Sequence, residues 1–88
     1  MKKAPQKAKA VAQAMSKAEQ KATLEKVGRL VKKLREARTS QESFAYEVGF
    51  SRAQLNRYES GEDMMLSTFL KLLYGLEKSP ADFFKELK

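Results

Sequence analysis

Two residue types that often carry chemistry are missing from this chain. It contains no cysteine and no histidine. Disulfides, zinc sites of the usual Cys/His kind, thiol nucleophiles and imidazole bases are therefore excluded. The carboxylates that remain have no such partner and no glycine-rich phosphate loop to work with. We therefore expect no cofactor, no bound metal and no enzymatic activity.

Long apolar runs are missing as well. The longest are only a few residues, and the chain begins with lysine, alanine and glutamine rather than with an apolar leader. Neither a membrane span nor a secretory signal is predicted, so we expect a cytoplasmic protein without a membrane partner. With 88 residues, of which 42% are hydrophobic, the chain can bury one small core.

Positive charge is abundant and unevenly placed. The chain has 18 lysines and arginines against 11 acidic residues, a net charge of +7. Residues 1–22 hold six lysines and one glutamate, so this segment alone supplies +5. Such an excess favours a polyanionic partner, either nucleic acid or an anionic membrane.

The same segment divides the chain in two. Residues 1–22 are rich in alanine and lysine and poor in large apolar residues, which predicts a basic N-terminal arm that is at least partly disordered. Residues 23–88 form the predicted domain. Three readings of the arm stay open: it contacts DNA phosphates or a groove, it only solubilises, or it extends the first helix backwards, since Ser16 and Glu19 fit a capping box.

Apolar spacing in the remainder predicts five helices. Leucines and valines recur at steps of three and four over residues 23–37, and further helices are expected between 39 and 49, over 52–60, over 68–75 and after Pro80. The predicted N-caps of the last four are Thr39, Ser51, Ser67 and Ser79. No segment alternates apolar and polar residues, so the fold class is all-α.

Residues 41–61, QESFAYEVGFSRAQLNRYESG, contain a distinctive pattern. Small Ala45 suits a helix crossing, Gly49 suits a turn with positive φ, and the apolar anchors around them are Phe44, Val48, Phe50, Leu55 and Tyr58. The segment resembles the helix-turn-helix of the Cro and lambda-repressor-like family, also called the xenobiotic-response-element family. The resemblance covers roughly residues 27–87 and implies a five-helix lambda-repressor-like DNA-binding domain in which helices 2 and 3 form the motif.

An ordinary αα-hairpin would show the same apolar spacing and turn glycine. It would not predict the polar residues around them, which are Ser-Gln-Glu at 40–42 and Arg-x-Glu-x-Gly at 57–61. Two features depart from the family pattern. Residues 37–39 lack the glycine often found there, and Glu62-Asp63 is acidic where many relatives are basic.

The third predicted helix has one polar face. At 100° per residue this face lies opposite Leu55 and Tyr58, and it holds Arg52, Ala53, Asn56, Arg57 and Ser60. Arginine can bond guanine O6 and N7, asparagine can pair with an adenine edge, and an alanine methyl can touch a thymine methyl. The predicted base-reading residues are therefore Arg52, Ala53, Asn56 and Arg57. The alternative is a solvated, charged helix surface.

The resemblance also implies roles for neighbouring residues. Gln41 would clamp a phosphate and support Arg52, while Ser51, Gln54 and Ser60 would flank the groove and hold the DNA backbone. Glu59 would pair with an arginine of the first helix, for which Arg35 is the candidate.

These features predict a sequence-specific regulator of transcription, a repressor in its simplest form, that binds double-stranded DNA. One copy would bury little DNA surface, so we expect a homodimer on a pseudo-palindromic operator, with the dimer surface after Ser67 and including Phe84 or Met65. The alternative from another class is a protein-interaction module with the same fold, such as an antitoxin that binds a toxin or a bridging coactivator.

Overall fold

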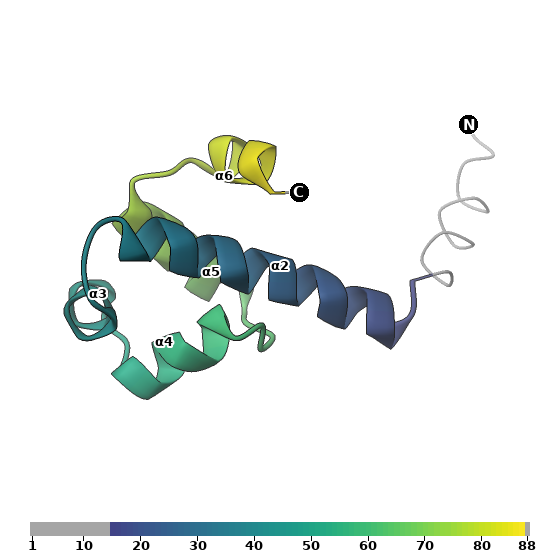
Figure 1. Cartoon of the computed structure of the whole chain (residues 1–88), viewed down its shortest axis with the longest axis horizontal. Coiled ribbons are helices and arrows are strands. Elements are labelled where there is room, and N and C mark those ends of the chain that lie inside the picture. Colours follow the sequence, from purple (N-terminus) through teal and green to yellow (C-terminus); the bar gives the residue numbers. More distant parts are fainter. Residues whose placement is uncertain (1–14, 88) are drawn as a thin grey trace.

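The computed structural model describes residues 15–87, and this part of the chain is all-helical. Its helices are α2 (Lys17–Glu36), α3 (Gln41–Val48), α4 (Arg52–Glu59), α5 (Leu66–Leu76) and α6 (Pro80–Glu86) (Figure 1). The prediction of an all-α class is confirmed for these residues. None of these helices is both long and apolar enough to cross a membrane.

Helix α2 begins earlier than the apolar spacing predicted. It begins at Lys17 rather than at Thr23 because a capping box holds its first turn. The Glu19 N–H donates to Ser16 Oγ at 3.1 Å, and the Ser16 N–H donates to Glu19 Oε1 at 2.8 Å. Residues 17–22 of the predicted arm therefore belong to a helix, and residues 1–14 lie outside the described part.

Two of the four predicted N-caps are wrong. Ser40, not Thr39, caps α3, with its hydroxyl accepting from the Ser43 N–H at 3.1 Å. Helix α5 begins at Leu66 after Met65 and has no side-chain cap hydrogen bond, so Ser67 lies inside it. Packing of the apolar face of α5 outweighs the preference of serine for the N-cap position.

The other two predicted caps are confirmed. Ser51 caps α4, and the Ser79 hydroxyl accepts from the Asp82 N–H at 3.1 Å with Pro80 in the first turn of α6. Each serine hydroxyl accepts a hydrogen bond from a backbone N–H of the first helical turn that would otherwise lack a partner.

Each described helix contributes a fully buried side chain to one core. These side chains are Val31, Phe44, Leu55, Leu72 and Phe83, in the order of the helices. Burial of one such side chain contributes about 1.5–3 kcal/mol. The core therefore lies where the five helices meet.

Helices α4 and α6 lie on opposite sides of α2 (Figure 1). Helix α6 is attached to α5 by aromatic contacts, with the rings of Phe69 and Phe83 edge to face at 5.3 Å between centroids. Its other phenylalanine, Phe84, is exposed. The face of α4 that points away from the core is thus remote from α6.

Candidate functional site

Helices α3 and α4 are joined by a short turn, residues 49–51. Gly49 has φ of +84°, the left-handed region that glycine adopts without strain, and its N–H donates to the carbonyl of Ala45 at 2.9 Å. In Figure 1, α3 is seen nearly end-on whereas α4 lies across the picture, so their axes cross steeply. Buried Ala45 suits the packing of these two helices, as the sequence predicted.

Ser51 and Gln54 determine where α4 begins. The Gln54 N–H donates to Ser51 Oγ at 3.0 Å, and the Ser51 N–H donates to Gln54 Oε1 at 2.9 Å. This reciprocal capping box satisfies two N–H groups that a helix start leaves unpaired. The two residues, predicted to hold the DNA backbone, therefore also hold the first turn of α4.

The predicted base-reading residues share one exposed face of α4. Leu55 and Glu59 are buried on the inner side of the helix and Tyr58 is half-buried. Every member of the predicted polar face is exposed: Arg52, Ala53, Asn56, Arg57 and Ser60. We name this surface, made of these five residues, the α4 polar face.

A buried ion pair joins α2 to the last residue of α4. Arg35 Nε donates to Glu59 Oε2 at 2.9 Å and Nη2 donates to Oε1 at 2.8 Å, with side chains only 8% and 2% exposed. Nη1 donates to the Thr39 carbonyl at 3.2 Å. The hydrogen bond to Glu59 raises the pKa of Arg35 above its ordinary value, and burial opposes this shift. The pairing of Arg35 with Glu59 is confirmed.

Gln41 connects this ion pair to the α4 polar face. Its Nε2 donates to Glu59 Oε1 at 2.9 Å and to Asn56 Oδ1 at 3.2 Å. Within residues 15–87 no hydrogen bond joins Gln41 to Arg52, the partner that the resemblance implied. The partner is Asn56 instead, because Asn56 and Glu59 are three residues apart and lie one turn from each other beside Gln41.

Arg57 has a partner that the sequence did not predict. Its Nε donates to Glu62 Oε1 at 3.0 Å, and the two side chains are 51% and 55% exposed. Glu62 lies beyond the end of α4, where the chain turns back, so helical spacing could not reveal the contact. One predicted base-reading guanidinium is therefore held beside a carboxylate.

The first turns of α2 reach the α4 polar face. A hollow of about 280 Å³ lies between the two helices and is lined by Lys21, Glu25, Asn56, Arg57, Ser60, Gly61 and Glu62. Lys21 is exposed there, and it belongs to the segment that the sequence assigned to an arm. Basic charge of α2 is thus brought next to the end of α4.

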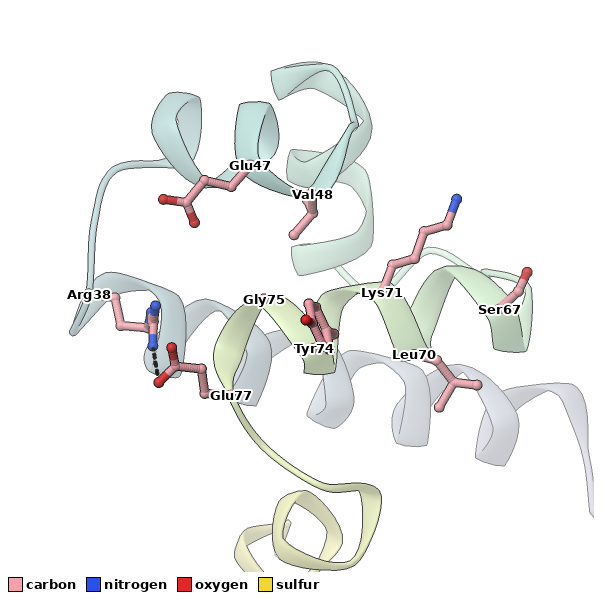
Figure 2. Close-up of a pocket in the computed structure, with 9 residues that line it drawn as sticks. All are labelled: Arg38, Glu47, Val48, Ser67, Leu70, Lys71, Tyr74, Gly75 and Glu77. Atoms are coloured by element: carbon pink, nitrogen blue, oxygen red, sulfur yellow. Dashed lines mark ion pairs between the residues drawn. The ribbon is translucent and has the colours of Figure 1, made fainter.

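A second hollow lies apart from the α4 polar face. It measures about 680 Å³ and lies between α3 and α5, with Glu47 and Val48 above and Leu70, Lys71 and Tyr74 below (Figure 2). At one end Arg38 pairs with Glu77 at 3.3 Å. None of the predicted DNA-contacting residues lines it.

Metal ligands do not gather in the described part. Within residues 15–87 no group of three or more acidic side chains could hold a metal ion. Comparisons with models of protein families, with curated proteins and with solved structures found no match to this chain.

Proposed function

We propose that this chain is a sequence-specific regulator of transcription that binds double-stranded DNA. In this proposal α3 and α4 are the helix-turn-helix of a lambda-repressor-like domain, and α4 enters the major groove. The observation that carries it is the α4 polar face, which holds two arginines, an asparagine and an alanine. The helix that presents this face is held on its inner side by the buried ion pair of Arg35 with Glu59. A helix of this kind fits a major groove about 12 Å wide.

The side chains on this face suit base edges. Arg52 and Arg57 have the donor geometry for guanine O6 and N7, and Asn56 has the donor and acceptor for adenine. The methyl group of Ala53 can contact the methyl group of thymine. In this proposal the Gln41 side chain supports Asn56, and Ser51, Gln54 and Ser60 contact the DNA backbone.

Charge on α2 supports the same proposal. This helix carries seven basic and three acidic side chains, whereas residues 41–86 carry five basic and eight acidic ones. Phosphate contacts supply most of the sequence-independent affinity for DNA. Lys21, beside the α4 polar face, is the described basic residue best placed to add such a contact.

Two copies would read two half-sites. We propose a homodimer on a pseudo-palindromic operator, with half-sites about 34 Å apart. An apolar groove of about 220 Å³, lined in part by Leu66, Phe69 and Phe84, lies at α5 and α6. Since α6 lies across α2 from α4, a contact through Phe84 would leave the α4 polar face free (Figure 1). Occupation of a promoter by such a dimer is the simplest route to repression.

Light scattering tests the dimer. The wild-type chain should have the mass of two copies, alone or on operator DNA, and Phe84→Ser should lower that mass. Phe84 is half exposed, so this variant should keep its fold, which thermal unfolding can check. A monomer under both conditions contradicts the dimer.

Selection of bound sequences from a random DNA pool tests the proposed function. The wild-type chain should enrich one motif, and Arg52→Ala or Arg57→Ala should each lose about 1–3 kcal/mol of binding at one base position. Lys85→Ala is the control: it removes an exposed basic side chain on α6, away from the α4 polar face, and should leave the motif unchanged. If the wild-type chain enriches no motif, it does not read DNA sequence.

The alternative is a protein-interaction module, such as an antitoxin. The observation in its favour is the exposed apolar surface of α5 and α6, where Leu66, Leu70, Tyr74 and Phe84 face solvent. In that case Leu70→Ser should abolish binding to a protein partner, while Arg52→Ala should not.

A further inference from the structure

We propose that Glu59 and Gln41 are positioning residues that decide which hydrogen-bonding group Asn56 offers to a base. The inference rests on the proposed function. It concerns a chain of hydrogen bonds that runs from Arg35 in the core through Glu59 and Gln41 to Asn56 on the α4 polar face.

The orientation of the Gln41 amide follows from its neighbour. The carboxylate of Glu59 can only accept hydrogen bonds, and the nearest polar atom of Gln41 lies 2.9 Å from its Oε1. That atom must therefore be the amide nitrogen. The carbonyl oxygen of Gln41 would put two acceptors in contact.

The same nitrogen fixes Asn56. Gln41 Nε2 has two hydrogens, one for Glu59 and one for the side-chain atom of Asn56 that lies 3.2 Å away. This atom must be an acceptor, so Asn56 turns its Oδ1 towards Gln41. Its amide nitrogen, with both hydrogens, is the group left for a base.

The Glu59 carboxylate, which orients Gln41 and through it Asn56, cannot rotate freely. Both oxygens of Glu59 accept from Arg35, and both side chains are nearly buried. Asn56 by contrast is exposed and would sample either amide orientation without Gln41. Holding a side chain in its bound orientation beforehand lowers the entropy lost on binding.

A preference among bases follows from this orientation. An outward N–H donor suits the acceptors of the major groove, which are purine N7, guanine O6 and thymine O4. It disfavours cytosine, which presents the N4 amino donor there. The second lone pair of Asn56 Oδ1 stays available, so a two-bond contact with adenine is compatible with the arrangement.

The experiment compares selected DNA motifs among variants. Asn56→Ala first identifies the base position that depends on Asn56. At that position Gln41→Ala should reduce discrimination against cytosine roughly tenfold and leave the other positions unchanged. Gln20→Ala, which removes an exposed amide from α2, is the matched control and should change nothing.

A second variant reverses the polarity. Asn56→Asp offers only acceptors, so the same position should shift towards cytosine. Thermal unfolding of each variant separates loss of fold from loss of preference.

The outcomes separate the two proposals. If the wild-type chain enriches no motif, the proposed function fails and the inference falls with it. If the wild-type chain enriches a motif but Gln41→Ala keeps full discrimination at the Asn56 position, or weakens binding to all sequences alike, Gln41 is only structural. The inference is then wrong although the proposed function stands.

Discussion

Arg35 forms a buried ion pair with Glu59, and this pair bears directly on the stability of the fold. Its guanidinium and the Glu59 carboxylate are removed from water and satisfy each other. Replacing only one partner leaves an unpaired charge in the core, which typically costs 3–5 kcal/mol. Exposed ion pairs of similar length contribute about 1 kcal/mol or less.

We therefore predict that Arg35→Ala lowers the free energy of unfolding by roughly 3–5 kcal/mol. Arg38→Ala, which breaks the exposed pair with Glu77, is the matched control and should lose less than about 1 kcal/mol. Denaturant unfolding followed by circular dichroism measures both. Equal losses would show that the Arg35 pair contributes no more than a surface pair.

Glu62 limits what Arg57 can contact. We predict that Glu62→Gln strengthens DNA binding up to about fivefold, because it frees the guanidinium and removes a negative charge beside the α4 polar face. Glu47→Gln changes the net charge equally but lies on the hollow between α3 and α5. Titration of labelled DNA compares them, and the same gain from both would mean that only net charge matters.

At the residue scale, the sequence predicted which side chains are exposed better than it predicted which side chains form hydrogen bonds with each other. Helical spacing placed Arg52, Ala53 and Asn56 on one exposed face because spacing alone decides which side of a helix a residue occupies. The partner of Gln41 was assigned to Arg52 and proved to be Asn56, since that choice depends on how α3 crosses α4. No spacing rule connects Arg57 with a residue beyond the helix end.

At the element scale, Gly28 allows two helices to approach each other closely. A Cβ atom there would lie 2.7 Å from the backbone carbonyl oxygens of Tyr58 and Glu59 and 2.9 Å from the Gly61 nitrogen. These are backbone atoms that cannot turn aside. Helix α2 can therefore pack on the end of α4 only because residue 28 has no side chain.

We predict that Gly28→Ala destabilises the chain by roughly 1–2 kcal/mol, because the clash outweighs the gain of about 1 kcal/mol in helix propensity. Ala22→Gly on the exposed side of the same helix calibrates propensity alone and should lose about 1 kcal/mol. Thermal unfolding measures both variants. A stabilised Gly28→Ala would contradict the close approach.

Helices were predicted more reliably than their first residues. The apolar spacing found all five helices of residues 15–87, because each buries a face with helical period. The caps at Thr39 and Ser67 were wrong because a neighbouring residue could also begin each helix. Packing of the helix decides which residue becomes the cap, and this is Ser40 for α3 and Met65 for α5. The start of α2 has no large apolar residues, so only its capping box could reveal it.

At the scale of the whole molecule, α2 carries an excess of basic residues and residues 41–86 an excess of acidic ones. Lys21 lies on the side of α2 next to the α4 polar face, and Lys85 lies on α6. We predict that Lys21→Gln lowers the slope of log binding constant against log salt by about 1, the value for one lost phosphate contact. Lys85→Gln should leave the slope unchanged. Titrations at several salt concentrations measure both, and equal slopes for the two variants would remove Lys21 from the interface.

Helix α4 has only eight residues, and isolated helices that short are marginal in water. Its first turn depends on Ser51 and Gln54, its last residue depends on Arg35, and Leu55 is buried in the common core. In the proposed function, only folded molecules can bind DNA, so the apparent affinity scales with the folded fraction of the protein. Under the proposed function, a substitution in the core far from α4, such as Phe83→Ala, should lower operator occupancy to the extent that it reduces the folded fraction.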